Sequence, residues 1–243
     1  MSFLTAIMRN TLHRAGYTIY KNEIGRHNPE SMSAGLDRMN KLGIRPDIVV
    51  DLGAAQGTWT EKALTIWPNA EYHLVEPLAE QVAFVKPLQE KHPKIFVHLA
   101  VAGEAPGEAA LTVSPDLDGS GVYGGAVEGQ IRMVPVMTID EIVRQSKGSV
   151  FMKFDTHGYE VPILKGAGET LKRADALVIE VYGFPLSPTC LLFHELSAYL
   201  DSVGFRLVDI VDIVRRPGDE AFWQADAFYL RKDHPVFQKN SYA

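Results

Sequence analysis

Residues 47–57 join an apolar, β-branched run to two glycines four positions apart. This order predicts a buried strand, a tight turn and then a helix. Gly53 and Gly57 let the backbone turn sharply and leave bare main chain for a ligand, and the helix points its free N–H groups at the same place. Asp51, where the strand ends, adds an acceptor that would repel a pyrophosphate. The turn therefore favours a nucleotide-like cofactor that carries an amine.

A second predicted strand, residues 71–77, ends in an acid about 25 residues after Asp51. In nucleotide-binding βαβ units, an acid at the end of the second strand binds the ribose hydroxyls. We therefore expect Glu76 to be a ribose ligand. A third apolar strand over 94–102 would place Ala100 in a small, apolar wall for an adenine ring.

From residue 47 onward, strand patterns alternate with helix patterns, which is typical of one α/β domain. We expect strands over 47–52, 71–77, 94–102, 149–155 and 176–181, and helices over 58–67, 80–91, 138–145, 161–174 and 191–203. Thr58 or Thr60 is expected to cap the first of these helices. Two extended segments, 107–114 and 131–138, flank a loop over 115–129 that is long enough to suggest a lid or substrate loop. Simple surface mobility would explain its length equally well. Residues 205–214 and 223–231 should pair as an antiparallel ribbon at a sheet edge, because no helix pattern separates them.

Residues 1–46 show no strand pattern, and we expect a helical cap followed by a single domain over 47–243. Residues 1–14 are amphipathic, which favours a packing helix or a homo-oligomer contact, with contact at a membrane surface as the weaker alternative. No apolar run approaches the ~18 residues of a membrane span, and no secretory signal pattern is present. The single cysteine, Cys190, excludes an internal disulfide and predicts a cytoplasmic location. A net charge of −6 argues against a nucleic-acid partner.

Four acids, Asp51, Glu76, Asp155 and Glu180, each fall near the carboxyl end of a predicted strand. In an open α/β sheet these ends share one edge, where ligands bind. An NAD-dependent oxidoreductase would also use such an edge. The turn nevertheless lacks the central glycine of G-x-G-x-x-G, and an acid stands where a pyrophosphate would pass.

Several motifs resemble the FkbM family of S-adenosylmethionine-dependent methyltransferases. They are VDLGAAQG (50–57), VEP (75–77), TID (138–140), KFDTHGYE (153–160), LKGA (164–167), GF (204–205) and WQADAF (223–228). The resemblance implies a Rossmann-like three-layer sandwich with a seven-stranded, mostly parallel sheet whose last strand is antiparallel. It also implies S-adenosylmethionine as the cofactor, and methyl transfer to a hydroxyl oxygen of a sugar, glycolipid or polyketide-type small molecule. Asp51 and Gly53 would then face the methionine part and Glu76 the ribose. His157 stands where the family more often has Gln or Glu.

The candidate site follows from these patterns. We predict cofactor contacts from Asp51, Gly53, Ala55, Gly57, Glu76, Pro77, Ala100 and Asp155. The sulfonium methyl is already activated, so the protein must align it with the acceptor and remove the hydroxyl proton. Asp155 and His157 are the candidate catalytic bases, and imidazole is suited to taking a proton near neutral pH. Two further possibilities are that Asp155 only holds the donor's amino group and that His157 only fills the turn.

Two other hypotheses remain at this point. Asp155 and Glu180 could bind a magnesium ion that orients a diol, since hard cations prefer carboxylates. No third ligand can be named from the sequence, and we predict no metal. The chain could also bind S-adenosylmethionine without turnover, because a fold does not guarantee its activity.

Overall fold

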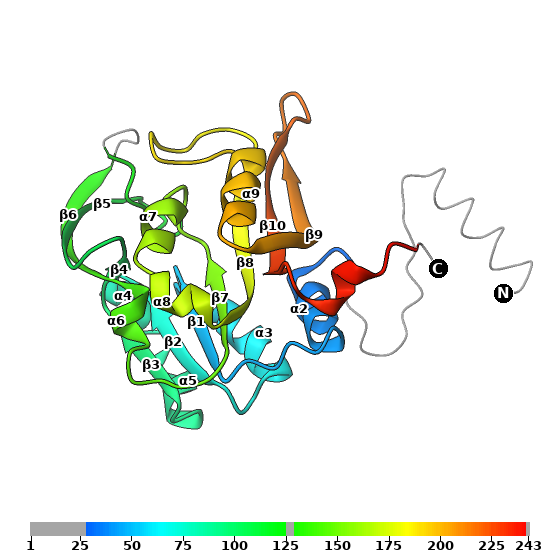
Figure 1. Cartoon of the computed structure of the whole chain (residues 1–243). Coiled ribbons are helices and arrows are strands. Elements are labelled where there is room, and N and C mark those ends of the chain that lie inside the picture. The colour runs from blue at the N-terminus through cyan, green and yellow to red at the C-terminus, as the bar shows by residue number, and fades with distance from the viewer. Residues whose placement is uncertain (1–27, 125–128, 242–243) are drawn as a thin grey trace, which may run out of the picture.

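A seven-stranded sheet forms the centre of the computed structural model, which describes residues 28–124 and 129–241 (Figure 1). Its strand order is β3-β2-β1-β7-β8-β10-β9. The strands are β1 (Ile48–Leu52), β2 (Glu71–Val75), β3 (Ile95–His98), β7 (Val150–Phe154), β8 (Ala174–Tyr182), β9 (Phe205–Arg215) and β10 (Phe222–Arg231). Only β10 runs antiparallel to its neighbours, β8 and β9. The α/β, Rossmann-like fold and the antiparallel edge ribbon are therefore confirmed.

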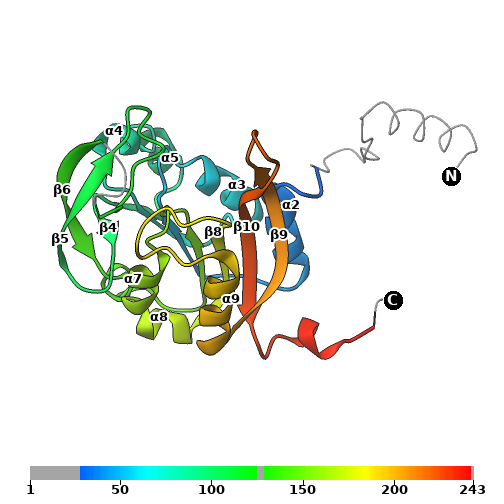
Figure 2. The same cartoon turned by 90° about the horizontal axis from the view of Figure 1, so that it is seen from above.

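Helices cover both faces of this sheet and make three layers (Figures 1 and 2). One face packs against α6 (Ile139–Ile142), α7 (Glu160–Lys165), α8 (Gly168–Lys172) and α9 (Phe193–Ser202). The other face packs against α2 (Met32–Lys41), α3 (Thr58–Ile66) and α5 (Lys86–Lys91), which α4 (Ala79–Val82) precedes. Strands β1 and β7 are buried along their whole length because both of their faces are covered.

The register of the central strands brings the predicted acids to one edge of the sheet. Asp51 of β1 pairs with Lys153 of β7, one residue before both strands end. Glu180 of β8 lies directly opposite Asp226 of β10. Because β1, β2, β7 and β8 are parallel, Asp155 and Glu180 come to the same end of the molecule as the glycine turn.

A second, three-stranded sheet lies beside this edge and was not predicted as a separate sheet (Figure 2). It has the order β4-β6-β5, from β4 (Val101–Ala102), β6 (Gln130–Met137) and β5 (Gly107–Val113). The expected single strand over 94–102 is therefore wrong. It divides into β3 in the large sheet and β4 in the small one, because the chain turns at Ala100, whose N–H donates to the His98 carbonyl.

Two expected helices are also broken. The helix expected over 80–91 divides into α4 and α5 near Pro87, which has no N–H to continue the helical hydrogen bonds. The helix expected over 161–174 divides into α7 and α8 after Gly166, which lies so close to Gly103 that an added Cβ would be 2.0 Å from its carbonyl oxygen. Asp140 then accepts hydrogen bonds from the backbone N–H groups of residues 169 and 170 and caps α8.

The expected cap of the first crossover helix differs as well. Gly57, with φ +81°, is the N-cap residue of α3, and no side chain caps it. Thr60 instead turns inward and donates a 2.6 Å hydrogen bond to Asp51. The hydroxyl therefore satisfies a buried carboxylate, which costs more to leave unpaired than an exposed helix end.

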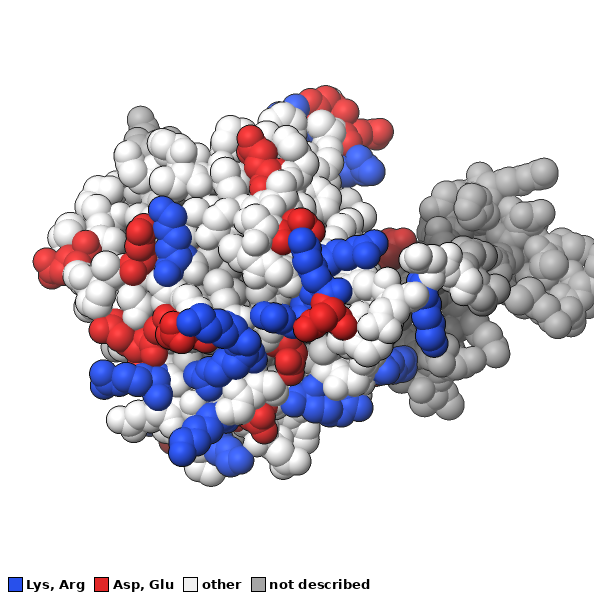
Figure 3. Space-filling model, in the orientation of Figure 1, with Lys and Arg blue, Asp and Glu red and all other residues white. Residues whose placement is uncertain are grey.

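The region before β1 is described only from residue 28. Ser31 caps α2, and Leu36 packs with the cluster on the α3 face of the sheet. The predicted helix over 1–14 and the polar segment up to residue 27 lie outside the described residues, so the 1–46 cap stays a prediction. No helix in the described ranges has the length and apolar character to cross a bilayer. Across the lower part of the face shown in Figure 3, Lys and Arg side chains lie among Asp and Glu side chains.

Candidate functional site

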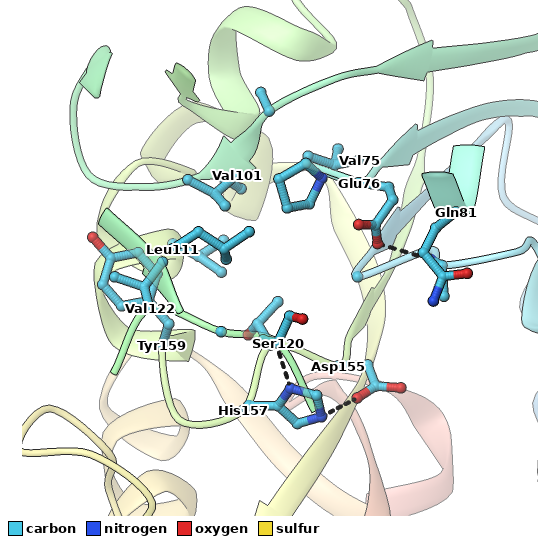
Figure 4. A pocket seen from close by; sticks show the side chains of 18 of the residues that line it. Val75, Glu76, Gln81, Val101, Leu111, Ser120, Val122, Asp155, His157 and Tyr159 are labelled. Atoms are coloured by element: carbon cyan, nitrogen blue, oxygen red, sulfur yellow. Dashed lines mark hydrogen bonds and ion pairs between the residues drawn. The ribbon is translucent and has the colours of Figure 1, made fainter. Parts of the chain in front are cut away.

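A cavity of about 300 Å³ lies at the carboxyl ends of β1, β2, β7 and β8, under the second sheet (Figure 4). The predicted residues that line it are Gly53, Ala55, Glu76, Pro77, Ala100, Asp155 and His157. Val101, Leu111 and Val122 form an apolar end, whereas Glu76, Asp155 and His157 form a polar side. Residues from strands of both sheets and from the loops that follow them thus meet in one hollow of a size suited to a small ligand.

The glycine turn supplies the floor of this cavity. Gly53 has φ +71° and Ala55 has φ +44°, so the turn is left-handed at two positions that line the cavity. The N–H groups of Gly53 and Ala54 both donate to the Val75 carbonyl, at 3.0 and 3.2 Å. These bonds tie the turn to β2 and bring it next to the acid that follows that strand.

Glu76 is held in place by the backbone on both of its oxygens. Oε2 accepts a 3.0 Å hydrogen bond from Ala55 N, and Oε1 accepts a 2.9 Å bond from Leu78 N. Burial raises the pKa of Glu76, and these two backbone hydrogen bonds oppose the rise. The carboxylate is 7 % exposed and lines the cavity, so its remaining lone pairs face the space where a ligand diol would bind.

Asp51 and Gly57, by contrast, are not among the residues that line the cavity. Asp51 is fully buried inside β1, where it accepts from Thr60 and lies 3.2 Å from Lys153 Nζ. Burial raises the pKa of Asp51, and the Lys153 ammonium opposes the rise. Any influence of Asp51 on a ligand in this cavity would therefore act through Lys153.

Lys153 belongs to the site by its contacts, and sequence reasoning missed it. Its Nζ lies 3.2 Å from both Asp51 Oδ1 and Asp155 Oδ2 and donates a 3.1 Å bond to the Gly53 carbonyl. Although burial alone would raise the pKa of Asp155, the Lys153 ammonium lowers it overall. The lysine therefore joins the glycine turn to the end of β7. Its position inside KFDTHGYE was the available signal, since an internal Lys in a buried strand needs a carboxylate partner.

His157 is oriented by the loop that was expected to be a lid. Its Nδ1 lies 3.0 Å from the Ser120 carbonyl oxygen. Because a carbonyl can only accept, Nδ1 carries the hydrogen, and Nε2 of the neutral ring is left as an acceptor. Nε2 lies 3.6 Å from Asp155 Oδ1 and 4.0 Å from Glu180 Oε2. The residue has φ +52°, a strained conformation that the adjacent Gly158, with φ +90°, helps the turn to reach.

Glu180 completes the polar side of the cavity. It accepts hydrogen bonds from the Tyr182 hydroxyl and the Gln224 amide. Burial, together with the charge of Asp155, raises the pKa of Glu180 to about 9. Asp155 and Glu180 thus form a pair in which Asp155, beside Lys153, keeps the negative charge.

The structure also supplies the third group that a metal site would need. Within the described part of the chain, Asp155, His157 and Glu180 each offer one ligand atom within 4.8 Å of the others. The Lys153 ammonium already pairs with Asp155, and both oxygens of Glu180 already accept hydrogen bonds. We therefore do not assign these residues as metal ligands.

A second cavity of about 250 Å³ adjoins the first, because Gly53, Ala55 and Asp155 line both. Its walls carry groups of both charges: Lys62, Lys153, Asp155, Asp212 and Asp226. Burial and the charge of Asp155 raise the pKa of Asp226 to about 7. Such a lining suits a ligand group that itself carries both charges.

Comparison with solved structures found similar folds with low sequence identity. A putative RNA methyltransferase from Pyrococcus horikoshii has 16 % identity and a TM-score of 0.47, covering 90 % of this chain and 96 % of that one. A 1,6-didemethyltoxoflavin-N1-methyltransferase from Burkholderia thailandensis, with bound S-adenosylhomocysteine, has 17 % identity and a TM-score of 0.46, covering 95 % and 89 %. A comparison with curated proteins found no significant match.

A family model described as "Methyltransferase FkbM domain" matches residues 51–207, which include the glycine turn, Glu76 and the KFDTHGYE block. The match extends over well more than half of the chain and contains every predicted site residue. The backbone-held carboxylate, the left-handed turn and the apolar end of the cavity fit S-adenosylmethionine. The chain therefore belongs to the FkbM methyltransferase family and is an S-adenosylmethionine-dependent methyltransferase.

Proposed function

We propose that the chain methylates a hydroxyl oxygen of a small molecule, with Nε2 of His157 as the proton acceptor. The observation that carries this proposal is the hydrogen bond from Nδ1 to the Ser120 carbonyl, which makes Nε2 the nitrogen that can accept a proton when the ring is neutral. A hydroxyl must lose its proton when its oxygen gains a methyl group, so a positioned base lowers the barrier. The base accepts that proton and later releases it to water.

Cofactor binding would use both cavities. Glu76 would hold the ribose hydroxyls, and Ala100 with Val101 would line the adenine. Gly53 and Asp155 would face the methionine part, in line with the charged lining of the second cavity. When bound, S-adenosylmethionine supplies a methyl group already activated on a sulfonium. The chain's own work is to orient the acceptor and to receive its proton.

The acceptor proposed is a neutral molecule that contains hydroxyl groups, such as a sugar, a glycolipid or a polyketide-type compound. The resemblance to the FkbM family implies this class. The net charge of −6 supports it, because an acidic chain repels the phosphates of a nucleic acid.

The proposal is tested by incubating the chain with methyl-labelled cofactor and a panel of sugars, glycolipids and polyketide-type alcohols. Methyl ethers should form with at least one acceptor, and His157→Ala should lower the turnover number about 100-fold or more while S-adenosylhomocysteine still binds. His194→Ala, on the surface of α9, is the matched control. An unchanged turnover number in His157→Ala at saturating acceptor would remove His157 from the mechanism.

One alternative is decided by the family match, and two have distinct outcomes in the same assay. Family membership decides against the nicotinamide-dependent oxidoreductase. Binding of S-adenosylhomocysteine with no transfer to any hydroxyl would favour a non-catalytic binding protein. Loss of transfer after chelation, with recovery on adding magnesium, would support a metal at Asp155, His157 and Glu180.

A further inference from the structure

Glu180 is an acid in a setting that offers no charge compensation. It is 9 % exposed and takes its two hydrogen bonds from neutral donors, the Tyr182 hydroxyl and the Gln224 amide. Of the basic groups that the structure describes, only His157 approaches it, with Nε2 4.0 Å away. Asp155, by comparison, lies 3.2 Å from the Lys153 ammonium.

The groups that face Glu180 come from every element around it. They are Asp155 from β7, His157 from the turn after β7, Tyr123 from the loop between β5 and β6, Asp226 from β10, and Tyr182 on β8 itself. Two of these are carboxyl groups, and the one ammonium in reach, on Lys153, already pairs with Asp51 and Asp155. Carboxylates this close in a buried site do not all ionise at neutral pH, and the one without a cationic partner keeps its proton.

A neutral Glu180 can donate a hydrogen bond, and the Asp155 carboxylate, which offers an oxygen within 4.8 Å of one of Glu180, is the charged acceptor beside it. It also adds no second negative charge beside Nε2 of His157, which already lies 3.6 Å from Asp155 Oδ1. An ionised Glu180 at 4.0 Å would be a second carboxylate that favours the imidazolium form, in which Nε2 carries a hydrogen and cannot accept a proton.

We propose that Glu180 is a positioning residue that acts as a neutral carboxylic acid, donating its proton to Asp155 and leaving Nε2 of His157 free to accept one. This proposal deepens the proposed function and rests on it for its link to methyl transfer. The raised pKa of Glu180, about 9, agrees with the geometry. Gln224 and Tyr182 hold the carboxyl group, so that its hydrogen points to Asp155 rather than to solvent.

The test uses the full chain without any acceptor, so it does not depend on methyl transfer. Protein labelled with carbon-13 at the glutamate carboxyl groups is titrated by NMR from pH 5 to pH 10, and Glu180→Gln identifies the signal of Glu180. We expect this carboxyl group to stay protonated through pH 7.5 and to titrate near pH 9. Titration near the ordinary glutamate value of about 4.5 would overturn the proposal.

The effect on His157 is measured in the same samples with nitrogen-15 histidine. Glu180→Gln replaces one neutral group by another, so the protonation midpoint of His157 should move by less than about 0.3 unit, a twofold change in its protonation equilibrium. If Glu180 were ionised, removing its charge would lower this midpoint by about one unit or more, a tenfold change that would refute the proposal. If Glu180 only packed against its neighbours, its charge would not be linked to the protonation of Nε2, and this measurement would have no expected outcome.

Tyr182→Phe provides a second variant if Glu180→Gln does not fold. The lost hydroxyl donates to Glu180 and favours its charged form, so the midpoint of the Glu180 carboxyl should rise further. A fall of this midpoint in Tyr182→Phe would contradict the proposed network. Failure of methyl transfer with a correct titration of Glu180 would instead count against the proposed function alone.

Discussion

A β-carbon placed on Gly53 would lie 2.0 Å from the carbonyl oxygen of Asp155. The glycine turn after β1 and the end of β7 therefore touch through their backbones. The N–H of Asp155 also donates a 3.0 Å bond to the Leu52 carbonyl. The contact therefore fixes the distance between the glycine turn and the Asp155–His157 segment, the two halves of the site.

Gly53→Ala should destabilise the chain because it combines a clash with a left-handed residue. The φ of +71° costs an alanine about 1–2 kcal/mol, and overpacking against backbone typically adds about 1–3 kcal/mol. We expect the free energy of unfolding, measured with urea, to fall by about 3 kcal/mol, with loss of S-adenosylhomocysteine binding. Gly43→Ala is the control, since φ is +94° there but no atom lies within 4 Å. Equal losses in the two variants would contradict the contact between the turn and β7.

Lys153→Met should expose the cost of an unpaired buried carboxylate. Asp51 is fully buried and would lose its cationic partner, and removal of one member of a buried pair typically costs about 3–5 kcal/mol. The free energy of unfolding at pH 7 should fall by that amount. In Lys172→Met, which removes an exposed pair with Glu169, the change should stay within about 0.5 kcal/mol. A Lys153→Met protein as stable as the parent would show that Asp51 does not depend on this ion pair.

Glu76→Ala should weaken cofactor binding. A charged acceptor contributes about 1.5–3 kcal/mol to a buried hydrogen bond, so the Kd for S-adenosylhomocysteine should rise about 10- to 100-fold in calorimetry. The Kd of Glu76→Gln should lie between those of the parent and Glu76→Ala, because Gln keeps one oxygen that can accept from a backbone N–H group. The control is Glu80→Ala, whose side chain lies on the surface and pairs with Arg132. An unchanged Kd in Glu76→Ala would show that the ribose is held elsewhere.

The free energy of unfolding should depend on pH through the titration of Glu180. Its pKa is raised to about 9 from an ordinary value of 4.5, so between these values the folded state binds more protons than the unfolded state. Stability from this group is therefore full below pH 4.5 and is lost as the pH rises toward 9, by up to about 1.4 kcal/mol per pH unit.

Because Glu180→Gln cannot ionise, its stability relative to the parent should increase steadily between pH 5.5 and pH 8.5. The measurement is urea unfolding of both proteins at one-unit intervals. Asp226 contributes equally to both proteins and cancels in the difference, provided that its own titration is unchanged. Parallel stability curves would mean that Glu180 ionises alike in the folded and unfolded states.

Local patterns were sufficient for much of the fold. The apolar runs at β1, β7 and β8, the glycine turn and the acids near the strand ends predicted a mostly parallel sheet with its ligand edge at those acids. Glu76, Asp155 and Ala100 do line one cavity there. This worked because strand propensity, turn chemistry and the direction of parallel strands depend on neighbouring residues and on one general rule of α/β sheets. The helix break at Gly166 was missed because it depends on a close approach to Gly103, whereas the break near Pro87 had a local signal, the missing N–H of proline, that was overlooked.

The chemistry of the site was decided by contacts between distant segments. Register alone puts Lys153 beside Asp51, about 100 residues earlier in the chain, and so removes Asp51 from the cavity surface. The Ser120 carbonyl selects the tautomer of His157, and Gln224 of β10 holds Glu180 of β8. The sequence by itself determined the sheet, the cofactor edge and the candidate bases. Only the tertiary structure decided which carboxyl group keeps a proton, because burial and opposing charges depend on what the fold brings together.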